Sequence, residues 1–581
     1  MGVFINTDAM TFFNSPLSEM NEAGLERDVD FYTAKGGVEA VLFNMNFQRC
    51  YWRSHSREAI WDGVEFHDDG RLFFNGREVV NVDPEPAMKR WIVAAHELYR
   101  NGADIFGVRY RRCHENGAEM WHSMRMNDVH FTPDAELPMH NGLWRERPDL
   151  WRCHYRRQYS GIWNNNGLDY AKEEVREYQM ALVREYLEHE CDGIELDWLR
   201  APPICAPGME EPTAPLVTDF VRAVRAEADA AAAKWGHRVR IAVRTPQTPL
   251  DTRLAGLDVL AWADEGLVDV VVPSPAYRTN NALATPIDIW RRLLPSRVVL
   301  APCLEWGASP FPGGPHLRCD EASDAGFAAS FYHRGADTIY FYNHFRENGG
   351  FLDKESMRRF FSYAGDKDRV YAATRRQIHS YRTSPYGTEG DREVIAMPAE
   401  AWAKSVVAFR VDAGGGTADR RAIAIIGGDK PLNVDLRVNG AHCTPLEVHG
   451  SQFLVHSSGG PGAVPAATAH HENSKKLCDS ASSAPLRENS ISAANCPTVQ
   501  PSNCPTAPAA LPEPPKYKYS ANPLGMRGQD ADEAAATARD GLYLAAYEVP
   551  EGVLHDGANT LDIINLADEG FHPLWGEIYL P

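Results

Sequence analysis

The chain has 581 residues, 44% of them hydrophobic, which is enough for at least two folded units with large cores. Its 79 acidic residues outnumber 59 lysines and arginines, and the formal net charge is −20 at pH 7. This balance argues against a nucleic-acid partner, because binding a polyanion requires a basic surface, and it favours an uncharged partner such as a carbohydrate.

The first ten residues, MGVFINTDAM, contain no basic stretch followed by an apolar one, and no run of about 18 or more apolar residues occurs anywhere. We therefore expect a cytoplasmic protein without a membrane partner. The 11 cysteines are odd in number and lack CxxC spacing, so we expect reduced thiols, no structural zinc and no cofactor.

Eight β-rich segments alternate with amphipathic helical stretches up to about residue 345, as in βα units around a parallel sheet. The segments are 3–6, 38–44, 119–126, 193–198, 239–244, 268–273, 297–302 and 338–343. Eight strands, each followed by a helix, predict an α/β fold, a (β/α)8 TIM barrel that spans residues 1–365.

Two stretches between these strands carry further predictions. Residues 173–189, EEVREYQMALVREYLEH, have the period of a helix that packs outside the barrel. Its apolar side is formed by Val175, Met180, Leu182, Val183 and Leu187. The stretch near 50–84 is too long for a minimal loop after the second strand, and we expect it to form an inserted hairpin cap.

From about residue 395 the pattern changes to alternating β-rich runs divided by Gly, Asn and Asp turns, such as SVVAFRV, RRAIAIIGG, LNVDLRVNG and NTLDIINLADEG. We expect a linker at 366–394 and an all-β sandwich domain at 395–581. The Ser-, Pro- and Ala-rich residues 457–515 interrupt this domain. Their composition cannot bury enough apolar surface to offset chain entropy, so we expect them to be disordered.

The fourth predicted strand lies in CDGIELDWLR, residues 191–200, and ends with two carboxylates. Because successive side chains of a strand face opposite ways, Glu195 and Asp197 share the face that looks into the barrel. A buried carboxylate is costly without a partner, so we expect Arg125 or Arg244 to pair with Glu195. Asp197, one step nearer the mouth, is then the better candidate for direct chemistry.

Catalytic groups of a barrel come from the C-terminal ends of its strands and from the loops that follow them. At these ends, besides the two carboxylates of strand four, we find as candidates Asp8, Asn44, Arg125, Asn127, Asp128, His130, Trp198, Arg200, Arg244, Glu305, Trp306, Asn343 and His344. Carboxylates, aromatic rings and polar donors together are what a glycosidase needs for proton transfer, for sugar faces and for hydroxyls. No GxSxG, GxGxxG or GxxxxGK[ST] motif points to serine hydrolysis, nicotinamide chemistry or phosphoryl transfer.

The segments MRMNDVH, DYAKEEVREYQMALVREYLE, CDGIELDWLRAP and GADTIYFYNHF resemble those of bacterial glycoside-hydrolase-like TIM-barrel proteins, the hypothetical "family 10" glycosyl hydrolases. The resemblance covers about the first 350 residues and implies the barrel fold. The site residues that it implies are Arg125, Asn127, Asp128, His130, Glu195, Asp197, Arg200, Asn343 and His344.

The sequence of the fourth predicted strand also resembles the corresponding strand of two other barrel families. DGIELDW is similar to the DGxDxDxE signature of family 18 chitinases, but Leu199 stands at the position of their acid and cannot donate a proton. The large clan of retaining barrels has its acid at strand four and its nucleophile at strand seven. That arrangement corresponds to Asp197 and Glu305, although the Asn-Glu pair of that clan is missing from strand four.

The leading hypothesis is a glycoside hydrolase that acts on an oligosaccharide or glycoconjugate, with Asp197 as general acid and Glu305 as nucleophile or base. Glu195 and Arg125 would hold the acid in place, and the other candidates would bind substrate. One alternative is a catalytically inactive carbohydrate-binding barrel. Another is a metal-assisted hydrolase or isomerase that uses Asp128, His130 and a strand-four carboxylate. A homo-oligomer is compatible with each.

Overall fold

The structure is a computed structural model. It describes residues 1–80, 88–132, 134–153, 166–275, 282–305, 307–308, 317–346, 353–379, 382–383, 394–395, 401–446 and 543–581. The predictions made for Trp306 and for the stretch 457–515 lie outside these residues.

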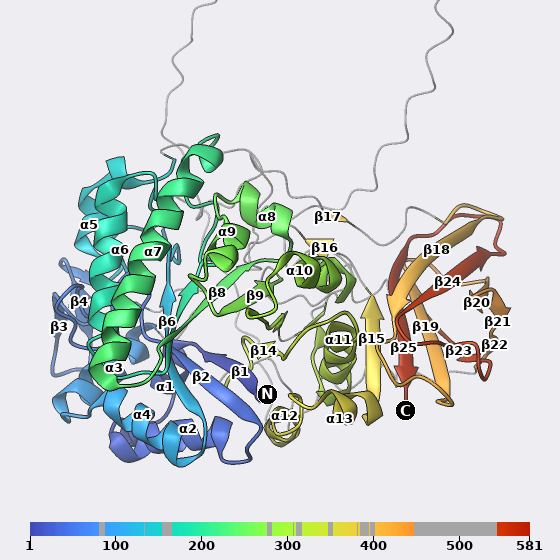
Figure 1. The fold of residues 1–581 in the computed structure, drawn as a ribbon, viewed down its shortest axis with the longest axis horizontal. Coiled ribbons are helices and arrows are strands. Elements are labelled where there is room, and N and C mark those ends of the chain that lie inside the picture. The colour runs from blue at the N-terminus through green and yellow to red at the C-terminus, as the bar shows by residue number, and fades with distance from the viewer. Residues whose placement is uncertain are drawn as a thin grey trace, which may run out of the picture. The chain divides into compact units, whose positions relative to one another are not determined.

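A nine-stranded parallel sheet forms the centre of the first 345 residues (Figure 1). In spatial order its strands are β10 (Val299–Leu300), β9 (Val270–Ser274), β8 (Arg240–Pro246), β7 (Gly193–Asp197), β6 (Glu119–Arg125), β2 (Val38–Asn44), β1 (Val3–Thr7), β14 (Tyr340–Phe341) and β11 (Cys303–Leu304). Each of the eight predicted strand segments overlaps one of them, and β11 follows directly after the seventh segment, so the mixed α/β fold with a parallel sheet is confirmed.

The two edges of this sheet meet in one stretch of chain. β10 pairs with β9 and β11 pairs with β14, yet only Ala301 and Pro302 separate β10 from β11. The pairing continues through the break, because Ala301 N–H donates to the Val271 carbonyl and Tyr340 N–H donates to the Pro302 carbonyl. Pro302 has no N–H to donate, which accounts for the interruption. The sheet is therefore curled, as a barrel requires.

Helices lie outside the curled sheet (Figure 1). The longer ones are α2 (Glu22–Thr33), α3 (Met88–Arg100), α4 (Ile105–Glu115), α6 (Glu173–Tyr186), α7 (Glu210–Trp235) and α11 (Glu321–His333). The shorter ones are α1 (Ala9–Phe13), α5 (Gly142–Glu146), α8 (Pro249–Leu254), α9 (Val259–Asp264), α10 (Ile287–Leu293), α12 (Lys354–Phe361) and α13 (Lys367–Ala372). No helix in the described part of the chain combines the length and the hydropathy needed to cross a bilayer.

Helix α6 forms within the predicted stretch and buries the expected side. Val175, Met180, Leu182, Val183 and Leu187 are all buried, and each belongs to the main hydrophobic core. The apolar period of the sequence therefore identified the face that packs on the barrel.

The inserted cap is a three-stranded antiparallel sheet of β3 (Val64–Phe66), β4 (Leu72–Phe74) and β5 (Arg77–Glu78). Gly70 lies in the turn between β3 and β4 at φ 78°, a left-handed conformation that suits glycine. The chain that leads into the cap is fastened to α6, because the Glu185 carboxylate accepts hydrogen bonds from Trp52 Nε1 and Ser54 Oγ at 3.0 and 2.7 Å. The three strands lie within the stretch near 50–84 for which a hairpin cap is expected.

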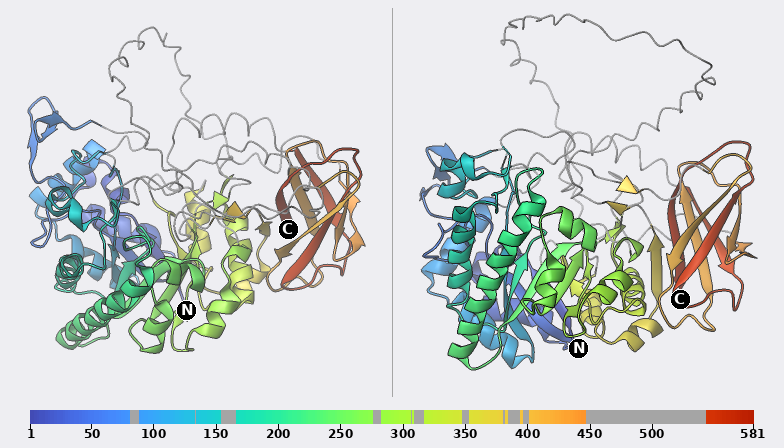
Figure 2. Two further views of the ribbon diagram at one scale, coloured as in Figure 1. Left: turned by 90° about the horizontal axis from the view of Figure 1, so that it is seen from above. Right: turned by 45° about the horizontal axis from the view of Figure 1, so that its top comes forward.

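Two antiparallel sheets follow (Figure 2). The five-stranded one has the order β15 (Arg375–His379), β25 (Pro573–Leu580), β19 (Ala422–Gly428), β23 (Tyr543–Val549) and β22 (Thr444–Pro445). The four-stranded one has the order β18 (Val406–Asp412), β24 (Ala558–Asn565), β20 (Val434–Val438) and β21 (Ala441–His442). Both sheets contribute to a single buried cluster, which includes Ile426 and Ile578 from one and Leu436 and Leu561 from the other.

The segment 366–394, expected to be a linker, instead contains α13 and β15, and β15 pairs along its whole length with the last strand, β25. Arg376 is fixed there by an ion pair with Glu577, Nε to Oε1 at 2.7 Å. This pairing joins residues about 200 positions apart, and no local sequence pattern predicts it. Short strand pairs also form between β12 (Gly307–Ala308) and β13 (Leu317–Arg318), and between β16 (Arg382–Thr383) and β17 (Val394–Ile395).

Candidate functional site

Strand β7 places Glu195 and Asp197 inside the curled sheet. In its register Asp197 lies between Arg125 of β6 and Arg244 of β8, and Glu195 lies beside Ser123 of β6. The opposite face of β7 packs in the main core with the outer helices. The alternation predicted from the sequence is therefore confirmed, and both carboxylates are almost completely buried, at 0% and 1% exposure.

Glu195 is held by three neutral donors. Asn6 Nδ2 and Ser123 Oγ donate to its Oε2 at 2.8 and 2.6 Å, and Tyr340 OH donates to Oε1 at 2.6 Å. Burial and the nearby charge of Asp197 raise the pKa of Glu195 to about 7. The predicted ion pair with Arg125 or Arg244 is wrong, because both guanidinium groups contact other carboxylates.

Arg244 joins the carboxylates of strands β7 and β11. Its Nη1 lies 3.3 and 3.2 Å from the two oxygens of Asp197, and its Nη2 lies 3.4 Å from Glu305 Oε1. The guanidinium is fully buried and stacks over Tyr342, 3.6 Å from the ring centroid. One cation therefore connects the two residues that the sequence proposes as the catalytic pair.

Glu305 follows β11 directly and is completely buried. Burial raises the pKa of Glu305, while the charge of Arg244 and a hydrogen bond from Asn343 act in the opposite direction. Asn343 Nδ2 donates to Oε2 at 2.6 Å. Asn343 lies just after β14 at φ 62°, a conformation that asparagine tolerates better than most residues, and this turn aims its amide at Glu305.

A second charged group forms at the ends of β1 and β6. Arg125 donates to Asp8 and, at 2.8 Å, to Asp128 Oδ2, and its guanidinium lies 4.1 Å from the Phe47 ring centroid. Asp128 also contacts His130 Nδ1 at 3.0 Å. Burial acts to raise the pKa of Asp128, but the charges of His130 and Arg125 and the hydrogen bonds of His130 bring it below its usual range. Arg125 is thus committed to this group and does not hold Asp197, contrary to expectation.

Arg200 contacts both Asp197 and the ring of Tyr342. It donates to the hydroxyl of Tyr342, and its Nε lies 3.8 Å from Asp197 Oδ2. The Tyr342 ring therefore lies among cations, with Arg200 and Arg244 both within 5.1 Å of its centroid.

Three other predicted residues brace the chain around the site. Asn44 Nδ2 donates to the Ser123 carbonyl at 3.1 Å and ties β2 to β6. Asn127 bonds both backbone groups of Leu168, at 3.0 and 2.8 Å. His344 is buried between the Tyr342 carbonyl and Asp324 of α11, each at 2.8 Å, so its ring is directed towards backbone and helix.

Trp198, expected to bind substrate, lies in the helical layer. It is 0% exposed and packs against Tyr170, Phe220 and Trp262, with centroids 5.1, 6.1 and 5.9 Å away. The reason is the alternation of β7, because Trp198 continues the face opposite to Asp197. Its assignment to the binding site is therefore corrected.

No group of three or more His, Cys, Asp or Glu side chains that could hold a metal ion occurs within the described ranges. Asp128 and His130 lie together, as the metal-assisted alternative requires, but the carboxylate of Asp128 also contacts Arg125. We find no described strand-four carboxylate that completes a ligand set with them.

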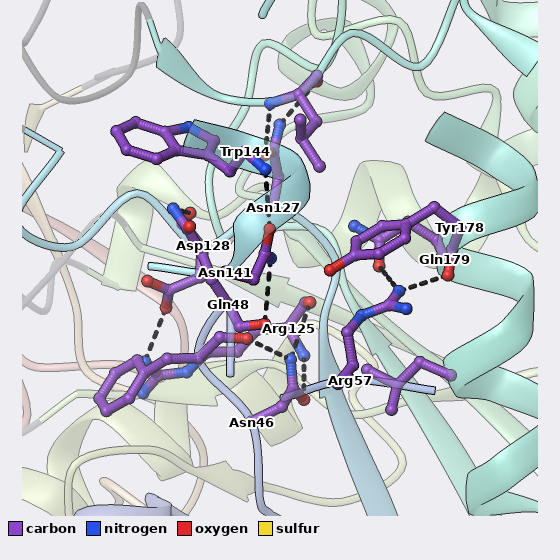
Figure 3. A pocket seen from close by; sticks show the side chains of 13 residues that line it. Asn46, Gln48, Arg57, Arg125, Asn127, Asp128, Asn141, Trp144, Tyr178 and Gln179 are labelled. Atoms are coloured by element: carbon purple, nitrogen blue, oxygen red, sulfur yellow. Dashed lines mark hydrogen bonds and ion pairs between the residues drawn. The ribbon is translucent and has the colours of Figure 1, made fainter. Parts of the chain in front are cut away.

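A pocket opens beside Arg125 and Asp128 (Figure 3), and neither Asp197 nor Glu305 lines it. It encloses about 320 Å³, including space that is open to solvent. Its lining residues are Asn46, Phe47, Gln48, Arg57, Arg125, Asn127, Asp128, Asn141, Trp144, Leu168, Tyr178, Gln179 and Leu182. Most of them come from the chain around the cap, the loop before α6 and α6 itself. Reasoning from strand ends could not find the α6 residues or Arg57, which lie away from the end of any strand.

No protein-family model matches the chain, and no curated protein matches it. Solved structures with similarity include an alpha-galactosidase from Thermus thermophilus, at 16% identity and a TM-score of 0.34 over 66% of this chain and 64% of that one. A glycoside hydrolase family 18 N-acetylglucosaminidase from Paenibacillus barengoltzii matches at 11% identity and a TM-score of 0.31, over 63% of this chain and 100% of that one. A family 36 alpha-galactosidase from Geobacillus stearothermophilus matches at 13% identity and a TM-score of 0.32, over 76% of this chain and 51% of that one.

Proposed function

We propose that the chain is a glycoside hydrolase acting on an oligosaccharide or glycoconjugate, with Asp197 and Glu305 as its two catalytic carboxylates. The observation that carries this proposal is the pairing of both residues with Arg244 at the C-terminal ends of β7 and β11. Two carboxylates in unlike surroundings are what glycosidic bond cleavage needs, because one must donate a proton while the other acts as base or nucleophile.

The surroundings of the two residues favour the reverse of the roles expected from the sequence. Arg244 contacts both oxygens of Asp197 and one oxygen of Glu305, whereas burial raises the pKa of Glu305. We therefore assign the proton to Glu305, as general acid, and the negative charge to Asp197, as nucleophile or base.

This assignment keeps the charge around Arg244 constant during the reaction. At the start Asp197 is ionised and Glu305 is protonated, so one anion faces one cation. When Glu305 gives its proton to the leaving oxygen and Asp197 forms a bond to the sugar, the anion moves from one carboxylate to the other. Arg244 contacts both, so the buried cation keeps a partner in each state.

Glu195 takes a supporting role in this proposal. It lies deeper in the curled sheet and receives three hydrogen bonds from β1, β6 and β14. With its pKa at about 7 it is protonated in a large fraction of molecules at neutral pH, which limits the negative charge next to Asp197.

We further propose that the activity resides in a TIM barrel spanning residues 1–365, and that β15 and the strands within 401–581 form a β-sandwich with an accessory role. The shared cluster of buried residues from both sheets supports the sandwich. The cytoplasmic location and the kinship with the "family 10" glycosyl hydrolases remain predictions from the sequence.

A binding protein without turnover is the second candidate, and one observation favours it. Asp197 and Glu305 are almost completely buried and engaged in ion pairs, so neither presents a free carboxylate in this conformation.

A panel of chromogenic aryl glycosides, assayed with the wild type and the Asp197→Asn and Glu305→Gln variants, tests the proposal. Release of the aryl group by the wild type, lost in Asp197→Asn and reduced in Glu305→Gln most strongly for poor leaving groups, supports hydrolysis. Binding of oligosaccharides without release, unchanged in the variants, supports the second candidate instead.

A further inference from the structure

The pocket beside Arg125 contains a cation that the reaction proposed above does not use. Arg57 is 6% exposed and lines the pocket together with Tyr178, whose ring centroid lies 3.2 Å from its guanidinium carbon. In Figure 3 these two side chains approach from one side, while Asp128 and Trp144 approach from the other.

The charge of Arg57 has no carboxylate partner among the described residues. Its contacts are the carbonyl oxygens of Ser56 and Tyr178 and the amide oxygen of Gln179. A guanidinium carries five N–H donors, and these contacts engage three of them. Because buried charges are normally paired, this cation leaves room for an anion in the pocket.

Three further polar atoms of the lining are buried without a hydrogen-bond partner in the described part of the chain. They are Nε of Arg125, Oε1 of Gln48 and the hydroxyl of Tyr178. Unsatisfied buried polar groups are uncommon in folded proteins, and here a donor, an acceptor and a hydroxyl that can be either gather at one pocket.

The charged residues that line the pocket determine whether it favours an anionic or a cationic ligand. Arg125 is balanced by Asp8 and Asp128, so its group contributes no surplus positive charge. Arg57 is the cation of the lining that no described carboxylate contacts. Trp144 is stacked between His140 and Trp151, at 4.4 and 4.9 Å, so its faces are not offered for stacking.

We propose that this pocket binds the carboxylate of an acidic sugar, a hexuronate, with the carboxylate on Arg57 and the hydroxyls on Gln48 and Tyr178. That the rest of the ligand is a sugar rests on the proposed function, whereas the carboxylate rests on Arg57 alone.

Calorimetric titration of the full chain with D-glucuronate, D-glucose and acetate tests this proposal without reading turnover. We expect glucuronate to bind at least about tenfold more tightly than glucose, and acetate to compete with it. Arg57→Met should abolish the preference for glucuronate. Arg53→Met is the matched control, because Arg53 lies four residues away, is exposed and already pairs with Asp62.

If Arg57→Met does not fold, two more conservative variants test whether Arg57 and Tyr178 bind glucuronate. Arg57→Lys keeps the charge but loses the forked geometry, and Tyr178→Phe keeps the ring under the guanidinium but loses the hydroxyl. Each should weaken glucuronate binding several-fold. Equal affinity for glucuronate and glucose, or a preference that survives the Arg57 variants, would overturn the carboxylate site. Glucuronate binding no tighter than acetate would overturn the sugar assignment.

Discussion

Asp197 and Glu305, which are 108 positions apart in the sequence, are joined by the two ends of one guanidinium, at 3.2 and 3.4 Å from Arg244. All three side chains are at most 1% exposed. Burial disfavours a second negative charge on two carboxylates that share one guanidinium, and it raises the pKa of Glu305. This relationship is the physical basis of the proposed chemistry.

Removing the shared cation should damage both stability and activity. Arg244→Met removes the guanidinium that contacts both buried carboxylates, and we expect the free energy of unfolding to fall by about 3–5 kcal/mol. Turnover of any aryl glycoside that is a substrate should fall by at least about 100-fold. Denaturant unfolding and initial rates measure the two effects.

Arg244→Lys provides the matched control, because it keeps the charge but cannot reach both carboxylates as a fork. It should be more stable than the methionine variant while still losing most turnover. Full activity in Arg244→Met would contradict a role for the shared guanidinium.

Glu195 should make stability depend on pH. Its pKa is about 7 in the folded chain against 4.5 ordinarily, so between these values the folded chain holds a proton that the unfolded chain releases. This contribution is fully present below pH 4.5 and is lost as the pH rises through 7. In Glu195→Gln the amide cannot titrate, so the loss of stability from about pH 5 to about pH 8 should shrink, on the order of 1–3 kcal/mol.

Urea unfolding across that pH range measures this effect, with the exposed surface variant Glu22→Gln as control. A pH profile of Glu195→Gln that coincides with that of the wild type would mean that Glu195 is ionised throughout.

We expect Trp198 to contribute to the stability of the fold and not to substrate binding. Trp198→Ala removes a large ring from the layer between β7 and the helices, and we expect a loss of about 3–5 kcal/mol in the free energy of unfolding. Trp198→Phe should lose less and leave KM unchanged. A raised KM with unaltered stability in the phenylalanine variant would instead indicate that Trp198 contacts the substrate.

Much of the fold could be predicted because periodicity is local. The alternation of GIELD already separated the inward Glu195 and Asp197 from the outward leucine and isoleucine, and the period of α6 identified its buried side. Strand β15 could not be predicted in this way. It is defined by pairing with Glu577 and its neighbours at the far end of the chain, and that pairing leaves no mark in the local pattern.

Which residues of the site contact each other was harder to predict than which residues belong to it. Strand ends correctly gathered Asp197, Arg244 and Glu305, but which cation meets which carboxylate depends on register and side-chain direction across several strands. Tyr340, which donates to Glu195, looked like an ordinary core tyrosine in TIYFYN. Arg57 was missed because it belongs to the chain before the cap and not to the end of a strand.

The role of the Asp197–Glu305 pair is tested most directly by comparing leaving groups. A good aryl leaving group departs without a proton, whereas a poor one needs the general acid. We expect Glu305→Gln to keep substantial turnover on dinitrophenyl glycosides and to lose at least about 100-fold on alkyl glycosides, while Asp197→Asn is inactive on both. Equal losses on both substrate classes in Glu305→Gln, or turnover that survives in Asp197→Asn, would contradict the proposed catalytic pair.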